Sequence, residues 1–558
     1  MQTVQYLYYA GFMDSKQFWE ENKNGVAWFP DDTLNAAYNA IDKHVGKETE
    51  HKTALIYESE DESQHSFTFG ELSRLSNKFA NFIHDLGIVK GDRVFIFLPR
   101  IPELYTSFLG ILKNGAIAGT MFSAFGQQAL KDRLQDSGAK AVFTTTELLP
   151  RIEEVKKDLT ELEHIVIVDS DEFKGKIMQA KSVFTPVHTK PEDYAFMLYT
   201  SGTTGKPKGV MHAHYAMLQQ HESAKLALDL KPGDIYWCTA DPGWVTGIAY
   251  TILSNWSLGV TTLVYGGRFD GDSWYKLIEK HKVTVWYTAP TAIRMLMAKG
   301  EELVKKYNLS SLRYLASVGE PLNPEAVVWS EKVFGIAFHD NWWQTETGSI
   351  MIANTPDLKI KPGSMGKPLP WISAEIVDDD GNSLAAGKEG NLALKPPWPS
   401  MMRSIWKNQE KYLSYFKNNW YFSGDHAKKD SEGYFWFIGR ADDVIKTSGE
   451  RVGPFEVESA LLDHPSVVEA GVIGKPDQLR GEIIKAFVVL QPGIQPSEEL
   501  KSELEEFVKK HLAGHAYPRE IEFIDKLPKT RSGKIMRRIL KAKELGQPIG
   551  DTSTLEDY

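Results

Sequence analysis

In some stretches of the chain, hydrophobic residues recur with the period of a helix. Between these stretches lie short continuous hydrophobic runs. Apolar side chains at positions 72, 75, 79, 82, 83 and 86 predict a helix, which Thr68 and Glu71 open as a capping box and Gly87 ends. Apolar runs predict strands at 93–98, 116–121, 139–144, 165–168, 261–265, 283–287 and 314–317, with helices at 103–113 and 129–135. Strands that alternate with helices at this spacing indicate βαβ units and a parallel sheet.

The pattern changes after about residue 363. Short alternating strands at 374–377, 391–394 and 434–438, separated by turns such as 380–382, predict a small antiparallel barrel or sheet. From 443 onward, strands at 468–473 and 483–490 and a helix at 498–510 predict a compact α/β unit. The expected fold is α/β: an N-terminal domain of residues 1–441 with a β subdomain from about 363, and a small mobile C-terminal α/β domain of 442–558. The short polar link at 439–443 would be the hinge.

Composition and charge narrow the class of protein. The 558 residues are 42% hydrophobic and 25% charged, which is ordinary for a globular protein, and the net charge of −10 argues against general nucleic-acid binding. The single cysteine, Cys238, excludes a disulfide framework, and its bulky neighbours favour buried packing over a nucleophilic role. The N-terminus has no signal-peptide pattern, and no uncharged apolar run is long enough for a membrane helix. We therefore expect a cytoplasmic protein with no membrane partner.

Residues 199–209 read Tyr-Thr-Ser-Gly-Thr-Thr-Gly-Lys-Pro-Lys-Gly. Glycines let backbone amides approach an anion, hydroxyls add donors, and lysines add positive charge, so this composition suits a polyphosphate. The stretch is not a Walker A loop, because Pro207 follows Lys206. A solvated loop is the commoner outcome for such a composition taken alone.

Four further clusters follow in order along the chain. They are Ser-Val-Gly-Glu-Pro at 317–321, Asn-Trp-Trp-Gln-Thr-Glu-Thr-Gly at 341–348, Tyr-Phe-Ser-Gly-Asp at 421–425 with Gly-Arg at 439–440, and Thr-Ser-Gly-Glu-Arg at 447–451. A fifth, Pro-Lys-Thr-Arg-Ser-Gly-Lys-Ile-Met-Arg-Arg, lies at 528–538. Taken singly, each has a plainer interpretation, such as a turn, a pair of core tryptophans or a solvated basic patch.

Together, these motifs resemble those of the adenylate-forming superfamily of acyl-CoA synthetases, luciferases and peptide-synthetase adenylation domains, and the resemblance covers nearly the whole chain. Residues 237–247 and the pair Trp342-Trp343 resemble the AMP-forming acetyl-CoA synthetases most, particularly the short bacterial type. The resemblance implies an acetate–CoA ligase. Acetate and ATP would give acetyl-AMP and pyrophosphate, and CoA would then give acetyl-CoA and AMP. The C-terminal domain would rotate about Asp442 between these half-reactions.

The resemblance also implies roles for individual residues, with ATP, Mg²⁺ and CoA as ligands. The catalytic residues would be Lys534, Glu346 (the magnesium ligand) and Thr200. The ATP-binding set would be Thr200, Ser201, Gly202, Thr203, Thr204, Gly205, Lys206, Lys208, Gly319, Glu320, Pro321, Asp340, Asn341, Trp342, Trp343, Gln344, Thr345, Asp425, Arg440, Arg451 and Lys534. The acyl pocket would be formed by Val245, Thr246, Val318 and Trp343. CoA would contact Ser448, Gly449, Thr246 and Lys509. A cation site would involve Leu462, His464 and Val467, although a lone histidine such as His464 is more often an ordinary surface residue.

Substrate choice follows from Trp343, whose counterpart is small in medium-chain relatives. An indole there would block a longer acyl chain, so acetate is the expected substrate and propionate a poor substitute. The remaining alternatives are a ligase for propionate or another short carboxylate, a silent nucleotide-binding sensor on the same fold, and a kinase that yields ADP. The expected partners are the small-molecule substrates and no nucleic acid, with a lysine acetyltransferase and deacetylase acting on Lys534. The expected assembly is a monomer or weak oligomer.

Overall fold

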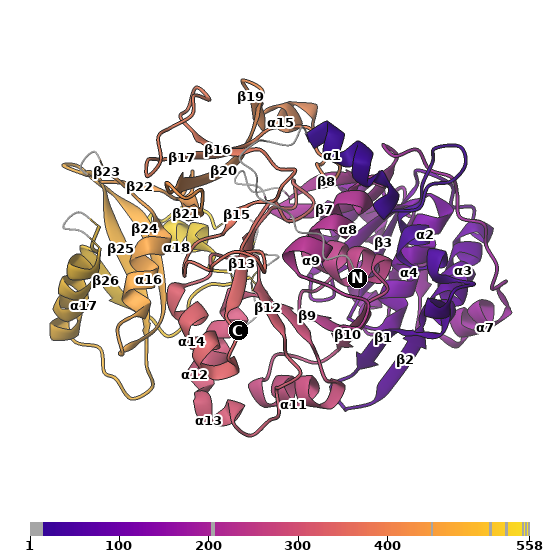
Figure 1. Ribbon diagram of the computed structural model, residues 1–558, viewed down its shortest axis with the longest axis horizontal. Coiled ribbons are helices and arrows are strands. Elements are labelled where there is room, and N and C mark those ends of the chain that lie inside the picture. Colours follow the sequence, from indigo (N-terminus) through magenta and orange to yellow (C-terminus); the bar gives the residue numbers. More distant parts are fainter. Residues whose placement is uncertain are drawn as a thin grey trace.

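The computed structural model describes residues 15–201, 207–447, 450–512, 516–530 and 534–549, together with residues 552 and 555. Within these residues, two large mixed sheets and their helices make up the N-terminal part, and two smaller five-stranded sheets follow (Figure 1). The last of these sheets belongs to the C-terminal residues, which lie beside helices α12 and α14 (Figure 1).

The first sheet has seven strands in the order β18-β8-β7-β4-β3-β5-β6. Strands β7, β4, β3, β5 and β6 are parallel, whereas β8 and β18 are antiparallel additions at one edge. Its strands are β3 Arg93–Leu98, β4 Ile117–Phe122, β5 Ala141–Thr144, β6 His164–Ile167, β7 Tyr194–Ser201, β8 Pro207–Ala213 and β18 Ser404–Ile405. The accompanying helices are α3 Phe69–Asp85, α4 Pro102–Asn114, α5 Gln127–Ser137, α6 Leu149–Glu153 and α7 Asp171–Gln179.

The second sheet has nine strands in the order β15-β14-β13-β12-β11-β9-β10-β1-β2. These are β1 Thr53–Glu58, β2 Gln64–Thr68, β9 Ile235–Cys238, β10 Thr261–Tyr265, β11 Val285–Thr288, β12 Tyr314–Ser317, β13 Phe338–Trp342, β14 Ile352–Ala353 and β15 Lys367–Pro368. The helices of this part are α1 Ser15–Asn22, α2 Ala36–Ala40, α8 Ala216–Ala227, α9 Val245–Ile248, α10 Ser254–Ser257, α11 Gly271–His281, α12 Pro290–Lys299, α13 Glu301–Val304 and α14 Pro324–Phe334.

The two smaller sheets follow in chain order. The antiparallel sheet contains β16 Ala374–Val377, β17 Glu389–Leu394, β19 Phe416–Lys417, β20 Trp420–Lys429 and β21 Phe435–Arg440, with helix α15 Gln409–Leu413. The C-terminal unit contains β22 Ile445–Thr447, β23 Glu450–Val452, β24 Val467–Asp477, β25 Gly481–Leu490 and β26 Glu520–Phe523, with helices α16 Pro454–Leu462, α17 Glu498–His511 and α18 Arg537–Glu544.

Much of this architecture agrees with the sequence analysis. The α/β class and the separate antiparallel sheet are confirmed, as are the strands at 93–98, 261–265, 314–317 and 374–377. The capping box is present: Glu71 N donates to Thr68 Oγ1 at 3.1 Å, and Thr68 N donates to Glu71 Oε2 at 2.8 Å. Cys238 is buried in β9, as its bulky neighbours predicted.

The predicted parallel sheet was only part of the observed pairing. The residues around the glycine-rich stretch form an antiparallel hairpin, β7–β8, so the sheet is mixed and not purely parallel. The antiparallel β1–β2 pair at the edge of the second sheet was also missed. Hairpin pairing depends on contacts between strands, and the apolar period of one strand does not report them.

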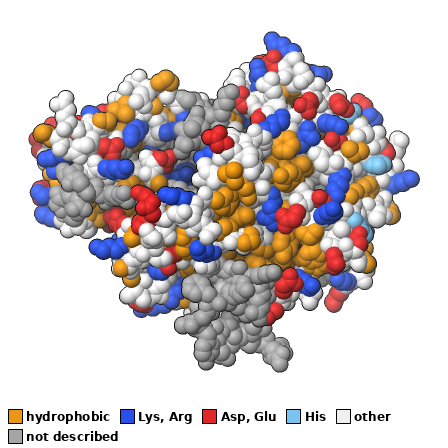
Figure 2. Space-filling model, turned by 90° about the horizontal axis from the view of Figure 1, so that it is seen from above, with side chains coloured by type: hydrophobic (Ala, Val, Ile, Leu, Met, Phe, Trp, Pro, Cys, Tyr) orange, Lys and Arg blue, Asp and Glu red, His pale blue; other side chains and the backbone are white. Residues whose placement is uncertain are grey.

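The surface carries both signs of charge. On the face seen from above, described Lys and Arg side chains are interspersed with Asp and Glu, and hydrophobic side chains gather near the middle (Figure 2). The described side chains of this face therefore form no continuous basic field of the kind that follows nucleic-acid phosphates. Among the described helices, none is long and apolar enough to cross a membrane.

Candidate active site

Strands β12 and β13 bring two predicted motifs to one edge of the nine-stranded sheet. They run parallel, with Ser317 opposite Asp340, so residues 318–321 and 343–348 follow the ends of the two strands beside each other. Gly319 turns the chain with φ of +98°, a conformation that L side chains rarely adopt. Asp340 is buried, and burial raises its pKa well above the ordinary value although nearby backbone amides donate to the carboxylate.

The β7–β8 hairpin brings Lys208 to a carboxylate of the second motif. Lys208 Nζ lies 2.9 Å from Glu346 Oε1, and Tyr415 Oη donates to the same oxygen at 3.0 Å. Lys208 also donates to Tyr415 Oη, and the Tyr415 ring stacks on Tyr421 with centroids 5.7 Å apart. Burial alone would raise the pKa of Glu346, but the charge of Lys208 and these hydrogen bonds more than offset it and hold the pKa below its ordinary value. Glu346 is therefore an ionised carboxylate near neutral pH.

Asp425 lies at a bulge in β20. Between Phe422 and His426 this strand advances four residues while β17 advances two, and Gly424 within the bulge has φ of +74°. Strand β20 continues past Asp425 to Lys429, so the aspartate lies within the strand and not at its end.

The bulge directs the Asp425 side chain toward several donors. Arg440, directly opposite on β21, donates to Asp425 Oδ1 at 3.1 Å. Trp342 Nε1 and Gln344 Nε2 donate to Oδ2 at 2.9 and 3.0 Å. Burial raises the pKa of this carboxyl, and the Arg440 charge opposes that rise. The antiparallel sheet and the 341–348 segment thus meet at one carboxylate.

Lys534 belongs to a turn of the C-terminal unit. Its backbone amide donates to Thr530 Oγ1 at 3.1 Å, and its carbonyl accepts from Thr530 N at 2.8 Å. Desolvation and then the positive charge of Arg440 lower the pKa of Lys534, whereas Asp425 opposes the shift. The charges of Asp425 and Arg440 therefore act on the Lys534 ammonium group, and the residue is exposed to solvent.

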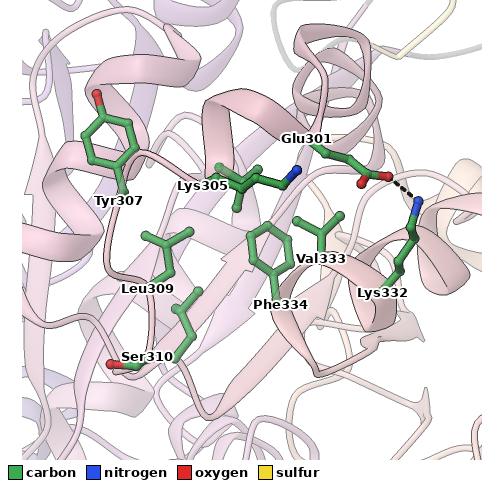
Figure 3. Close-up of a pocket in the computed structure, with 10 residues that line it drawn as sticks. Glu301, Lys305, Tyr307, Leu309, Ser310, Lys332, Val333 and Phe334 are labelled. Atoms are coloured by element: carbon green, nitrogen blue, oxygen red, sulfur yellow. Dashed lines mark hydrogen bonds and ion pairs between the residues drawn. The ribbon is translucent and has the colours of Figure 1, made fainter.

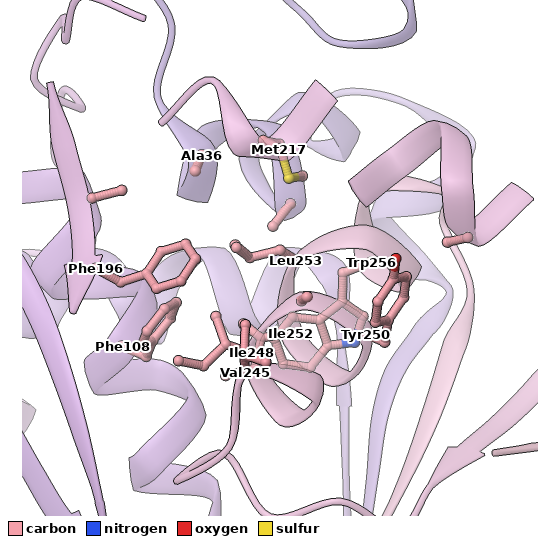
Figure 4. Packing of buried hydrophobic residues seen from close by; sticks show 14 of the residues in the cluster. Ala36, Phe108, Phe196, Met217, Val245, Ile248, Tyr250, Ile252, Leu253 and Trp256 are labelled. Carbon is pink, nitrogen blue, oxygen red and sulfur yellow. The ribbon is translucent and has the colours of Figure 1, made fainter. Parts of the chain in front are cut away.

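The predicted acyl-pocket residues belong to one buried apolar cluster. Val245, Val318 and Trp343 are each less than a tenth exposed, as is Thr246 beside them. Val245 and Tyr250 belong to one helical segment that continues from α9 through the π-helical turn Ala249–Leu253 (Figure 4). The indole of Trp343 donates from Nε1 to Tyr287 Oη at 3.3 Å. Tyr250 contacts the same indole edge-on at 5.2 Å, so two buried aromatic rings restrict its orientation.

The chain matches known protein families and curated proteins over most of its length. Residues 42–406 match the family described as AMP-binding enzyme, and residues 456–534 match the AMP-binding enzyme C-terminal domain. The chain belongs to the AMP-binding enzyme family. It is 56% identical over 534 residues to the acetyl-coenzyme A synthetase of Bacillus subtilis, covering 94% of this chain and 93% of that protein. It is 42% identical to the acetyl-coenzyme A synthetase of Methanothrix thermoacetophila, covering 98% of this chain and 88% of that protein.

Solved structures of this family have the same fold. The anthranilate CoA ligase AuaEII in complex with anthranoyl-AMP superposes with a TM-score of 0.85 at 32% identity, covering 92% of this chain and 98% of that one. A Brucella canis acyl-CoA synthetase superposes with a TM-score of 0.73 at 36% identity, covering 94% and 97%. The order and pairing of the strands described above are therefore those of an AMP-binding enzyme.

Several predicted site residues are not among the residues that the structure describes. Residues 202–206 of the glycine-rich stretch and the pair Ser448 and Gly449 are not among the described residues, and of Ser201 and Arg451 only the backbone is described. Asp442 lies in the turn between β21 and β22, with its Oδ1 3.8 Å from Arg440 Nε. Lys509 lies on α17 and pairs with Glu506 at 3.0 Å. Helix α17 lies at the outer edge of the C-terminal unit, away from the N-terminal part (Figure 1).

His464, predicted for a cation site, is buried and is not the surface residue that a lone histidine more often is. The side chain is 5% exposed and packs edge-on against Phe507 at 4.9 Å. Both ring nitrogens have protein partners, Ser466 N at Nδ1 and Glu503 Oε1 at Nε2, each at 3.3 Å. Both nitrogens of the imidazole are therefore occupied by protein partners. The cation site with Leu462 and Val467 stays a prediction.

Tyr415, Tyr287 and Tyr250 were not among the residues predicted for the site. None lies in a recognised motif, and a single tyrosine in a loop, strand or helix carries no local signal of what its side chain will contact. Their roles depend on neighbours 69, 56 and 93 positions away in the chain, namely Glu346 for the first and Trp343 for the other two.

A separate hollow of about 380 Å³ lies among α13, α14 and the connecting residues (Figure 3). Val304, Leu309 and Phe334 contribute apolar lining, and Glu301 pairs with Lys332 at its rim. None of the predicted site residues lines it, so it is distinct from the candidate active site.

The Lys208–Glu346 pair predicts a pH-dependent effect on stability. Lys208→Met leaves Glu346 partly buried without its cation, so the pKa of this carboxyl should rise from below to above its ordinary value. The variant should then be destabilised more at pH 7.5, where the unpaired carboxylate is ionised, than at pH 5.5. Thermal unfolding at both pH values would measure this as a larger loss of Tm at the higher pH.

The matched control is Lys411→Met, because Lys411 also lies over the Tyr415 ring, at 5.1 Å, but has no carboxylate partner among the described residues. Adding Glu346→Gln to Lys208→Met should remove the extra pH dependence. An equal loss of Tm at both pH values would contradict the assigned charge pair.

Proposed function

We propose that the protein is an AMP-forming acetate–CoA ligase. In the first half-reaction, an acetate oxygen attacks the α-phosphorus of ATP, and pyrophosphate leaves. In the second, the CoA thiolate attacks the acetyl carbonyl carbon of acetyl-AMP, and AMP leaves. The observation that carries the proposal is 56% identity over 94% of the chain to an acetyl-coenzyme A synthetase, together with the large indole of Trp343 at the proposed acyl wall.

The first half-reaction must bring two anions together, so positive charge and donors supply most of the catalysis. Lys534 would bridge acetate and the α-phosphate, and Lys208 with the 200–206 stretch would hold the other phosphates. Asp425 would accept the ribose hydroxyls, because its two oxygens are already oriented by donors from three other residues. Acetate is ionised at neutral pH, and no general base is required.

The residues present fit a nucleotide-bound Mg²⁺. Glu346 offers an ionised carboxylate, and Thr200 Oγ1 is buried without a hydrogen-bond partner among the described atoms. Such hard oxygen donors suit Mg²⁺, which usually takes one or two carboxylates and completes its shell with phosphates and water. Among the described residues, no group of three or more His, Cys, Asp or Glu side chains is arranged to hold a metal ion by itself. The ion would neutralise phosphate charge as pyrophosphate leaves.

The bridging charge of Lys534 would serve only the first half-reaction, so the second would use a different arrangement of the C-terminal unit. We propose that residues 442–558 turn about Asp442 and bring Ser448, Gly449 and Arg451 to the acetyl-adenylate. Thr246 and Lys509 would then contact CoA. Acetylation of Lys534 by a lysine acetyltransferase would remove the bridging charge and stop adenylate formation, and a deacetylase would restore it.

Acetate-dependent ATP–pyrophosphate exchange tests the function. The acid series is acetate, propionate, butyrate and octanoate without CoA, followed by addition of CoA and identification of the nucleotide product. Exchange strongest with acetate, then AMP and acetyl-CoA, is expected. Propionate preference would select the alternative short-chain ligase, ADP would indicate a kinase, and nucleotide binding with no exchange would indicate a silent sensor.

Trp343→Gly should lengthen the accepted acyl chain. Removing the indole opens the proposed wall, so kcat/KM for hexanoate should rise at least tenfold while that for acetate falls, since each methylene is worth about 1–3 kcal/mol. The contrast is Trp342→Phe, which loses the hydrogen bond to Asp425 and should raise the KM for ATP without changing chain preference. Unchanged chain preference in Trp343→Gly would refute the pocket assignment.

Lys534→Ala should separate the half-reactions. Exchange with acetate should fall about 100-fold or more, the usual cost of losing a group that stabilises transition-state charge. Thioester formation from supplied acetyl-AMP and CoA should stay within a few-fold of wild type. Lys543→Ala, an exposed lysine of α18, is the control and should affect neither. Equal loss of both activities in Lys534→Ala would count against two separate arrangements.

A further inference from the structure

Helix α14 of the large N-terminal part meets helix α16 of the C-terminal unit directly. Asn323, just before α14, donates from Nδ2 to Ser459 Oγ on α16 at 2.8 Å, across 136 positions of sequence. The two helices lie close to each other where the C-terminal unit adjoins the rest of the molecule (Figure 1). This hydrogen bond therefore depends on how the C-terminal unit is docked.

The Asn323 side chain makes this contact and does not cap helix α14. It occupies the N-cap position of α14, where an asparagine side chain ordinarily accepts from a first-turn amide, yet it makes no capping bond. Its Oδ1 instead accepts from Arg294 Nη1 at 3.0 Å, which leaves Nδ2 directed at Ser459. Arg294 is itself fixed by Glu320 at 2.9 Å. The hydrogen bond from Arg294 lies within the large part and orients the Asn323 side chain, which is 3% exposed in this docked arrangement.

The α16 side of the contact is connected to Lys534. Glu458, adjacent to Ser459, is buried and accepts from Arg537 Nε at 2.9 Å and from Val472 N at 2.8 Å. Arg537 begins α18, three residues after Lys534. Movement of α16 relative to α14 would therefore be transmitted through the Glu458–Arg537 pair to the turn that carries Lys534.

We propose that the Asn323–Ser459 hydrogen bond, oriented by Arg294, is a docking contact that holds the C-terminal unit where Lys534 faces the nucleotide site. Asn323, Arg294 and Ser459 are then positioning residues for adenylate formation. This inference rests on the proposed two-step ligase function. It requires that the contact be broken before the thioester-forming arrangement can assemble.

Ser459→Ala is the test variant, because alanine favours a helix more than serine and folding should be unaffected. Acetate-dependent exchange and thioester formation from supplied acetyl-AMP are each measured in single turnovers. If the two arrangements equilibrate rapidly, the ratio of these rates follows the docking equilibrium whichever arrangement predominates. Loss of one hydrogen bond should lower the ratio of exchange to thioester formation about threefold to tenfold. Ser502→Ala, on α17, is the matched control and should leave the ratio unchanged.

Further variants decide the mechanism. Asn323→Ala should lower the ratio as Ser459→Ala does, and the double variant should lower it no further, because both remove the same bond. Equal loss of both half-reactions in Ser459→Ala, or an unchanged ratio, would overturn the docking contact. Failure of the wild-type protein to exchange with any acid would instead overturn the proposed function.

Discussion

The proposed site depends on two largely buried carboxylates, Glu346 and Asp425, that lie where an anionic nucleotide is proposed to bind. Glu346 and Asp425 are partly or fully desolvated, and burial alone would favour their neutral forms. Each is met by a cation from another segment, Lys208 from the β7–β8 hairpin and Arg440 from β21. These pairs hold the carboxylate oxygens of Glu346 and Asp425 in place in a region that is also proposed to bind phosphate groups. The Lys208–Glu346 pair also joins the first large sheet to the 341–348 segment, and the bonds from Trp342 and Gln344 to Asp425 join that segment to the antiparallel sheet. The binding region therefore exists only when the sheets are assembled.

The two ends of the proposed site differ in rigidity, as their tasks require. At the acyl end, Trp343 is surrounded by Tyr250 and Tyr287, whose hydroxyls bond to Ser223 and Asn341. Such packing suits a wall that must reject an extra methylene, because close-packed interiors yield little to added volume. At the other end, Lys534 lies on a turn of the C-terminal unit and reaches solvent, which suits a group needed in only one half-reaction.

Regular elements could be predicted because their signals are local. The helix after Thr68 carries both its apolar period and its capping box within eighteen residues, and the strands at 93–98 and 314–317 are continuous apolar runs. The bulge in β20 and the β7–β8 pairing could not be predicted in this way, since each depends on register with a partner strand. His464 illustrates the same limit for a single residue: its burial depends on α17, more than thirty positions away.

The sequence by itself determined the fold class, the family and the types of residue available for chemistry, because these are encoded in periodicity and in contiguous motifs. Only the tertiary structure decided which partner each of those residues has. Tyr415 bonds to Glu346 across 69 positions, and Asn323 bonds to Ser459 across 136. Neither pair has a sequence signal, because a hydrogen bond depends on the distance and direction between two atoms, and for residues this far apart both are set by how sheets and helices pack.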